Sequence, residues 1–189
     1  MAHTRRVLRR TSLSFDPMAG KIVSIFILLS AALIGGGIYW AYNFWYYEEV
    51  TVDADGVQLT SLTLGTPEAI AFSNAQAIDA VSSPIRYRAC FQTELTPAEA
   101  SETFEMFEDP EPLNAPPWFD CFDALALGDA LRAGTAIAFT GERNITYGID
   151  RVVAITQDGR GFVWHQLNEC GDKLYDGTPA GENCPERTN

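Results

Sequence analysis

Histidine and basic side chains are scarce over most of this chain. Of its two histidines, only His165 lies outside the N-terminal tail. Residues 48–189 hold 8 of the 13 basic side chains but 24 of the 25 acidic ones, a net charge of −16. Binding to nucleic acid depends on contacts from Lys and Arg to phosphate. This composition therefore excludes nucleic acid as a partner of residues 48–189.

The motifs of common catalytic and cofactor sites are absent as well. The sequence has no phosphate-binding glycine loop, dinucleotide fingerprint or metalloprotease motif. No serine lies in a Gly-x-Ser-x-Gly elbow, and no two cysteines form a Cys-x-x-Cys pair. We therefore expect no cofactor, no metal site and no catalytic residue.

One long uncharged segment stands out near the N-terminus. Residues 22–40 carry no charge, and a helix of this length spans the roughly 30 Å hydrocarbon core of a bilayer. Aromatic residues follow as far as Tyr47, as is typical of a membrane interface. Basic residues precede the segment and acidic ones follow it, which predicts a cytoplasmic N-terminus. A cleaved signal peptide is the alternative, but its apolar region would be shorter and end at small residues.

Small residues on this predicted helix suggest a packing face. Ala31 and Gly35 are four residues apart, as are Ala32 and Gly36. Such spacing lets a second membrane helix approach closely, either from a larger complex or from another copy of the chain. The alternative is the ordinary tolerance of membrane helices for glycine.

The charge pattern divides the chain into three parts. Residues 1–17 are basic and lack an apolar period, so they form a cytoplasmic tail or lie upstream of a true start at Met18. Residues 18–47 form the membrane anchor with its aromatic interface, and residues 48–189 form a globular domain on the far side.

All four cysteines lie in the predicted outer domain. In an oxidising compartment, four cysteines most simply form two disulfides, for which three pairings are possible. Proximity in the sequence favours Cys90 with Cys121 and Cys170 with Cys184.

Hydrophobic patterning predicts an α+β domain. Strands are expected at residues 57–64, 85–91, 135–140, 145–156 and 161–167, and residues 69–78 are ambiguous between strand and helix. The last two strands flank Asp158-Gly159, a strong hairpin signal. Four to six mostly antiparallel strands are expected.

Two helices complete this domain. Thr96, Pro97 and Glu99 form a capping-box start for a helix that should end at Asp109, before a proline. Asp120 is expected to cap a second helix that stops at Gly134.

Aromatic and basic side chains are the remaining candidates for a ligand or docking surface. They are Trp118, Tyr147, Arg151, Trp164 and His165. Core packing explains most buried aromatic residues. His165 shares a predicted strand face with Val163 and Leu167, where a hydrogen-bonded structural histidine is more common than a catalytic one.

Several stretches together resemble a family of short, single-span alphaproteobacterial proteins with a periplasmic domain of unknown function. These stretches begin at Met18 (MAGKIV), Ser83 (SPIRYRACF), Trp118 (WFDCFDA), Tyr147 (YGIDRVVA) and Gly159 (GRGFVWHQ). The resemblance implies a single-pass protein of the bacterial inner membrane with a periplasmic domain. It implies no catalytic residues.

Three functions are consistent with these features. The first is a non-enzymatic accessory or interaction protein in contact with the lipid bilayer. The second is a periplasmic ligand-binding sensor domain with a pocket around Trp164. The third is an enzyme that uses His165.

Overall fold

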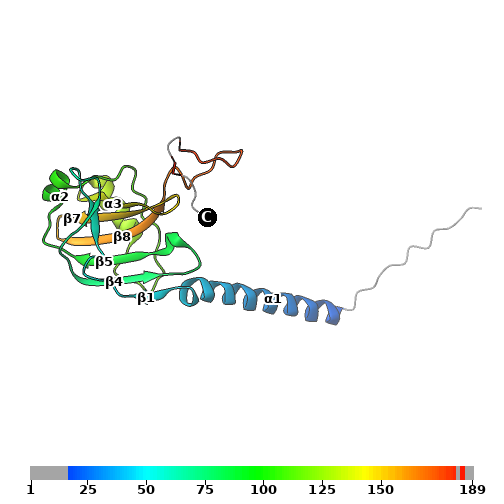
Figure 1. Cartoon of the computed structure of the whole chain (residues 1–189). Coiled ribbons are helices and arrows are strands. Elements are labelled where there is room, and N and C mark those ends of the chain that lie inside the picture. Colours follow the sequence, from blue (N-terminus) through cyan, green and yellow to red (C-terminus); the bar gives the residue numbers. More distant parts are fainter. Residues whose placement is uncertain (1–16, 182–183, 186–189) are drawn as a thin grey trace, which may run out of the picture. The chain divides into compact units, whose positions relative to one another are not determined.

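A computed structural model describes residues 17–181 and 184–185 (Figure 1). The described chain forms two compact units, which we treat separately: a helical unit ending at Tyr42 and a globular unit from Asn43 onward. Most of the predicted basic tail, residues 1–16, lies outside the described residues.

The helical unit contains the predicted apolar segment. Helix α1 spans Pro17–Trp40 and continues as a π-helical turn, Ala41–Trp45. Within the described chain, this is the one helix long and apolar enough to cross a membrane, with a mean hydropathy of 2.2. Such a helix close to an N-terminus is either a membrane anchor or a signal sequence.

The globular unit is built on an antiparallel six-stranded sheet. Its strands, in spatial order, are β1 (Glu48–Val50), β4 (Ser73–Asp79), β5 (Arg88–Gln92), β8 (Arg160–Leu167), β7 (Ile149–Thr156) and β6 (Ala136–Thr146). A separate two-stranded sheet contains β2 (Gln58–Thr60) and β3 (Pro67–Ala69). Together with two helices, these sheets confirm the predicted α+β class.

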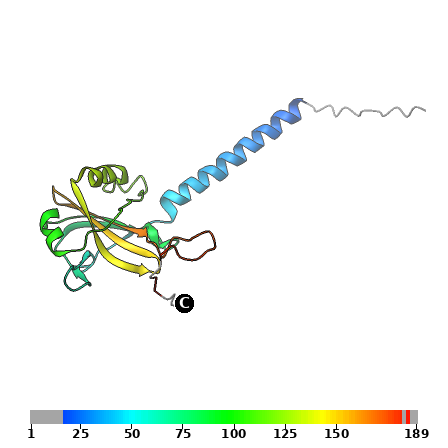
Figure 2. The ribbon, with the colours of Figure 1, turned by 90° about the horizontal axis from the view of Figure 1, so that it is seen from above.

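Both faces of the large sheet are covered, because successive side chains of a strand point to opposite faces. On one face, Val153, Ile155 and Val163 pack with residues of β2 and with Ala100 of α2 (Pro97–Thr103). On the other, Val152 and Trp164 pack with Leu127 of α3 (Ala124–Ala133). Figure 2 shows α3 lying across its face of the sheet.

Helix α2 begins as predicted but ends early. Its capping box is formed: Thr96 accepts from the Glu99 N–H, and the Glu99 carboxylate accepts from the Thr96 N–H. The predicted end at Asp109 is wrong, since the helix stops at Thr103. The Glu105 backbone instead bonds to Thr60 of β2 and Thr140 of β6. Strand-like pairing on both sides therefore replaces the last predicted turns of the helix.

The cap of α3 is Asp123, so the prediction of Asp120 as the cap is wrong. The Asp123 carboxylate accepts from the N–H groups of Leu125 and Ala126. The predicted stop is confirmed, because Gly134 adopts a left-handed conformation with φ 70°.

Several predicted strands are interrupted. The expected strand 145–156 is split by a turn at Tyr147 and Gly148, which joins β6 to β7. The strand expected from residue 85 begins only at Arg88, after a 3₁₀ turn, Pro84–Arg86. The β7–β8 hairpin at Asp158-Gly159 is confirmed, and the second half of the ambiguous segment 69–78 belongs to strand β4.

Candidate functional site

The chain passes from the aromatic cluster, Asn43–Tyr47, directly into the sheet. β1 starts at Glu48, which pairs with Asp79 of β4. The indole N–H of Trp118 donates to the Asn43 carbonyl, and its ring lies edge-on to Tyr47 at 6.5 Å. Trp118, one of the five candidate residues, therefore fixes the aromatic cluster to the connection before α3.

Arg86 supports the same cluster. Its guanidinium lies over the rings of Tyr46 and Tyr47, at 5.5 and 5.6 Å from their centroids. Each such cation–π contact contributes about 0.5–1 kcal/mol at an exposed site. The β4–β5 connection is thereby held against the residues that follow α1.

His165 and Arg151 are brought into direct contact. They are paired across β7 and β8, and Arg151 Nε donates to His165 Nε2 at 3.1 Å. His165 Nδ1 lies 2.7 Å from the Pro84 carbonyl. Since a carbonyl only accepts and the Arg151 N–H only donates, His165 is neutral with its proton on Nδ1.

The surroundings of His165 keep it neutral. Its ring stacks on Tyr87 at 4.8 Å, and the side chain is buried. Burial, together with the charges of Arg151 and Arg88, lowers the pKa of His165 to about 4, although its bond to Pro84 opposes this shift. Both ring nitrogens are engaged, so this geometry offers no site for accepting a substrate proton.

Trp164 lies on the opposite face of β8 from His165. It is fully buried, packs edge-on against Phe122 at 6.5 Å and donates to the Gln166 side chain. The structure therefore does not gather the five candidates into one pocket. Tyr147 lies in the turn between β6 and β7, and Trp118 lies beside the aromatic cluster.

A groove of about 810 Å³ lies elsewhere, at the end of the sheet far from Glu48. It is formed by the start of β4, the segment after β5 and the β7–β8 turn. Its apolar lining includes Ile70, Phe72, Leu95 and Phe104. Sequence reasoning missed it, because its three segments are distant along the chain and each alone has the composition of a loop.

A second cavity, of about 540 Å³, involves one of the five candidate residues for a ligand or docking surface. Trp118 and Cys121 line it together with Val50 of β1 and Gln76 of β4. Neither this cavity nor the groove is lined by Tyr147, Arg151, Trp164 or His165. The predicted pocket around Trp164 therefore does not coincide with either hollow.

Two disulfides fasten connecting segments to the sheet. Cys90 of β5 is bonded to Cys121, in the connection to α3, and Cys170 is bonded to Cys184. These are the pairings that proximity in the sequence favours. Within the described part of the chain, no group of three or more His, Cys, Asp or Glu side chains could hold a metal ion.

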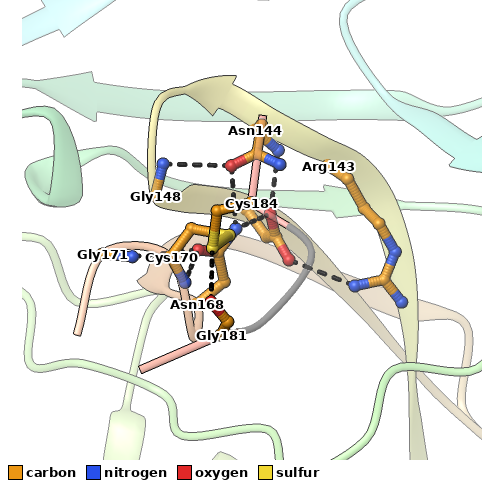
Figure 3. The surroundings of a disulfide bond; sticks show 9 residues. Arg143, Asn144, Gly148, Asn168, Cys170, Gly171, Gly181 and Cys184 are labelled. Atoms are coloured by element: carbon orange, nitrogen blue, oxygen red, sulfur yellow. Dashed lines mark hydrogen bonds and ion pairs between the residues drawn. A yellow bond between two sulfur atoms is a disulfide. The ribbon is translucent and has the colours of Figure 1, made fainter. Parts of the chain in front are cut away.

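A buried polar cluster lies beside the second disulfide (Figure 3). The Asp150 carboxylate, 1% exposed, accepts from the Asn144 N–H at 2.8 Å and from the Asn168 amide at 2.7 Å. Asn168 in turn accepts from the N–H groups of Cys170 and Gly171. This cluster joins the β6–β7 hairpin to the C-terminal segment.

Arg88 has a comparable structural role on the Trp164 face. It is buried and donates to the carbonyls of Leu113, Asn114, Ile85 and Tyr87. Burial lowers the pKa of Arg88 to about 10, so it stays charged near neutral pH. Its fork of donors fixes the proline-rich connection to β5.

A family model described as "Family of unknown function (DUF6446)" matches residues 57–185, more than half of the chain. The chain belongs to the DUF6446 family. The DUF6446 region contains both disulfides, the groove and the His165 cluster, whereas α1 and β1 precede it. No curated protein and no solved structure matches the chain. DUF6446 membership itself assigns no catalytic or binding role.

Proposed function

We propose that this chain is a membrane-anchored accessory protein without enzymatic activity, and that α1 holds its DUF6446 domain on the periplasmic side of a bacterial inner membrane. The observation that carries the proposal is the junction between anchor and domain. β1 begins at Glu48, eight residues after the last residue of α1, and pairs with β4. A retained helix would therefore keep the domain at the bilayer surface.

The two disulfides support a periplasmic position. Disulfides persist in oxidising compartments and are rare in the cytosol. The basic side chains before the apolar helix favour a cytoplasmic N-terminus, which places the domain on the opposite side. The state of His165, hydrogen-bonded at both ring nitrogens, argues against the enzyme hypothesis.

A topology reporter tests this arrangement. A phosphatase that is active only outside the cytosol, fused after Asn189, should be active, and the fusion should remain in the membrane fraction after alkaline washing. A fusion active only in the cytosol refutes the periplasmic position. Recovery of a processed, soluble domain shows that the helix is a signal sequence.

The partner of the anchor is proposed to be a membrane helix, from a larger complex or from a second copy. Gentle detergent extraction at native expression, followed by mass spectrometry, should recover the chain in an assembly. G35L with G36L should disperse the assembly, because bulky side chains prevent close approach of helices. The control variant I34L should leave the assembly intact. A lone monomer at native expression contradicts the accessory role.

The groove favours a second candidate, a ligand-binding sensor domain. Its apolar lining fits a small apolar ligand or an apolar peptide side chain. A fragment screen by NMR should shift the resonances of Phe72 and Leu95 together. F72D should abolish these shifts, whereas V81D, at the other end of the sheet, should not. Shifts scattered over the whole surface contradict the sensor function.

A further inference from the structure

Exposed apolar side chains gather at one end of the large sheet. We call this the junction end: the end at which the chain passes from Tyr47 into β1. Val81, just after β4, is 98% exposed, and Leu167, at the end of β8, is 46% exposed. Exposed apolar side chains that cluster at one place often mark a surface that contacts a partner or a membrane.

Strand register and one side-chain contact place these two residues at the same end as the aromatic cluster. Glu48 pairs with Asp79, the last residue of β4, and Val81 lies in the turn that follows. The same connection carries Arg86, whose guanidinium lies over the Tyr46 ring. Ile78 pairs with Arg88, and Arg88 pairs with Trp164. β8 runs three residues further, to Leu167, at the end of the sheet where β4 ends at Asp79, two residues before Val81.

The C-terminal segment adds a hairpin at the same end. It follows Leu167 directly and is closed by a bridge between Lys173 and Pro179. Near its tip, Leu174 is 55% exposed and Tyr175 is fully exposed. Figures 1 and 2 both show the hairpin projecting from this end of the sheet.

We propose that the junction end docks on the lipid bilayer, with Val81 and Tyr175 inserted at the boundary between headgroups and acyl chains. The inference rests on the proposed membrane anchor. Tyr46 belongs to the aromatic cluster that follows the apolar span, and amphipathic rings prefer the headgroup layer. The end of the sheet next to Tyr46 is therefore the part of the domain that we expect to face the headgroup layer.

Charges near the junction end include more acidic than basic groups. Glu48 and Glu49 lie on β1, Asp79 and Arg86 flank the Val81 turn, and Asp172, Lys173 and Asp176 belong to the hairpin. The contact is therefore made by apolar insertion, and it should form on uncharged phosphatidylcholine and weaken on anionic lipid. The groove, at the other end of the sheet, is left facing the aqueous phase.

Fluorescence quenching on the full chain tests the docking. In the oxidised protein the four native cysteines are paired, so V81C, Y175C and a control, E94C beside the groove, each add one reactive thiol. Each variant is labelled with an environment-sensitive fluorophore and reconstituted into phosphatidylcholine vesicles that contain lipid spin-labelled near the headgroup. Quenching at residues 81 and 175 should be at least twice that at residue 94.

A label at residue 33, within α1, separates the two proposals. If lipid that is spin-labelled deep in its acyl chain quenches the fluorophore of the L33C variant, the proposed anchor is supported. In that case, quenching at residue 81 or 175 that is no greater than at residue 94 overturns the docking proposal alone. If the residue 33 label is not quenched, the anchor fails and the docking fails with it.

Discussion

Arg151 on β7 donates a hydrogen bond to Nε2 of His165 on β8, whose Nδ1 faces the Pro84 carbonyl. The histidine is thereby held neutral between a cation and a carbonyl. Burial lowers the pKa of His165 in the folded state. The unfolded chain therefore binds a proton at this side chain more readily than the folded chain does.

Stability should therefore fall as the solution is acidified. The pKa of His165 drops from 6.5 to about 4 on folding, so its effect begins below pH 6.5 and is complete near pH 4. We expect the loss to reach about 2 kcal/mol by pH 5. Urea unfolding of the wild type and of H165Q, followed by near-UV circular dichroism at pH 7 and pH 5, measures it. The unfolding free energy of H165Q should lack this part of the pH dependence. If the unfolding free energies of wild type and H165Q fall equally between pH 7 and pH 5, a neutral His165 is contradicted.

Removal of the Asp150 carboxylate should loosen the C-terminal segment. D150A leaves the Asn144 N–H and the Asn168 amide without their shared acceptor and removes an ion-pair partner of Arg143. We expect a loss of roughly 2–3 kcal/mol in unfolding free energy. Hydrogen exchange should quicken at Gly171.

A matched control for this variant is D129A. Asp129 pairs with Arg132 on the exposed surface of α3, and such a pair contributes less than about 1 kcal/mol. An equal loss of stability in the two variants would show that the buried cluster has no special role.

The two disulfides should differ in the reach of their effects. C170S with C184S removes a link that spans 14 residues, and we expect a loss of roughly 3 kcal/mol, with faster hydrogen exchange confined to the C-terminal segment. C90S with C121S removes the link between β5 and the connection to α3, so exchange should quicken in the sheet itself. Exchange mass spectrometry distinguishes these outcomes. Faster exchange of β5 in the first variant would contradict the expected confinement.

Gly161 on β8 makes room for the ring of Phe91. A Cβ added at Gly161 would lie 2.0 Å from a ring carbon, so the ring would have to move within a buried core. We expect G161A to lower the unfolding free energy by about 1–3 kcal/mol. G128A, on α3, is the control: its Cβ would meet only the Arg132 side chain at 3.4 Å, and alanine favours a helix by about 1 kcal/mol. Similar stability of G161A and wild type would refute the close approach.

Some of the candidate site could have been resolved further from sequence. Trp164 and His165 are consecutive in a strand, and consecutive strand residues point to opposite faces. Their adjacency therefore already argued against a shared pocket. The contact between His165 and Arg151, by contrast, depends on the register between β7 and β8, which is not encoded by either strand alone.

Local chemistry, read from the sequence, determined the apolar span, the capping box at Thr96, the stop at Gly134 and the turn at Asp158-Gly159. Each depends on a few consecutive residues, so the signal is complete within a short window. Tertiary structure decided that α2 ends at Thr103, because the backbone beyond it pairs with β2 and β6. It also decided the groove and the pairing of Glu48 with Asp79, since both arise only when segments distant in sequence pack side by side.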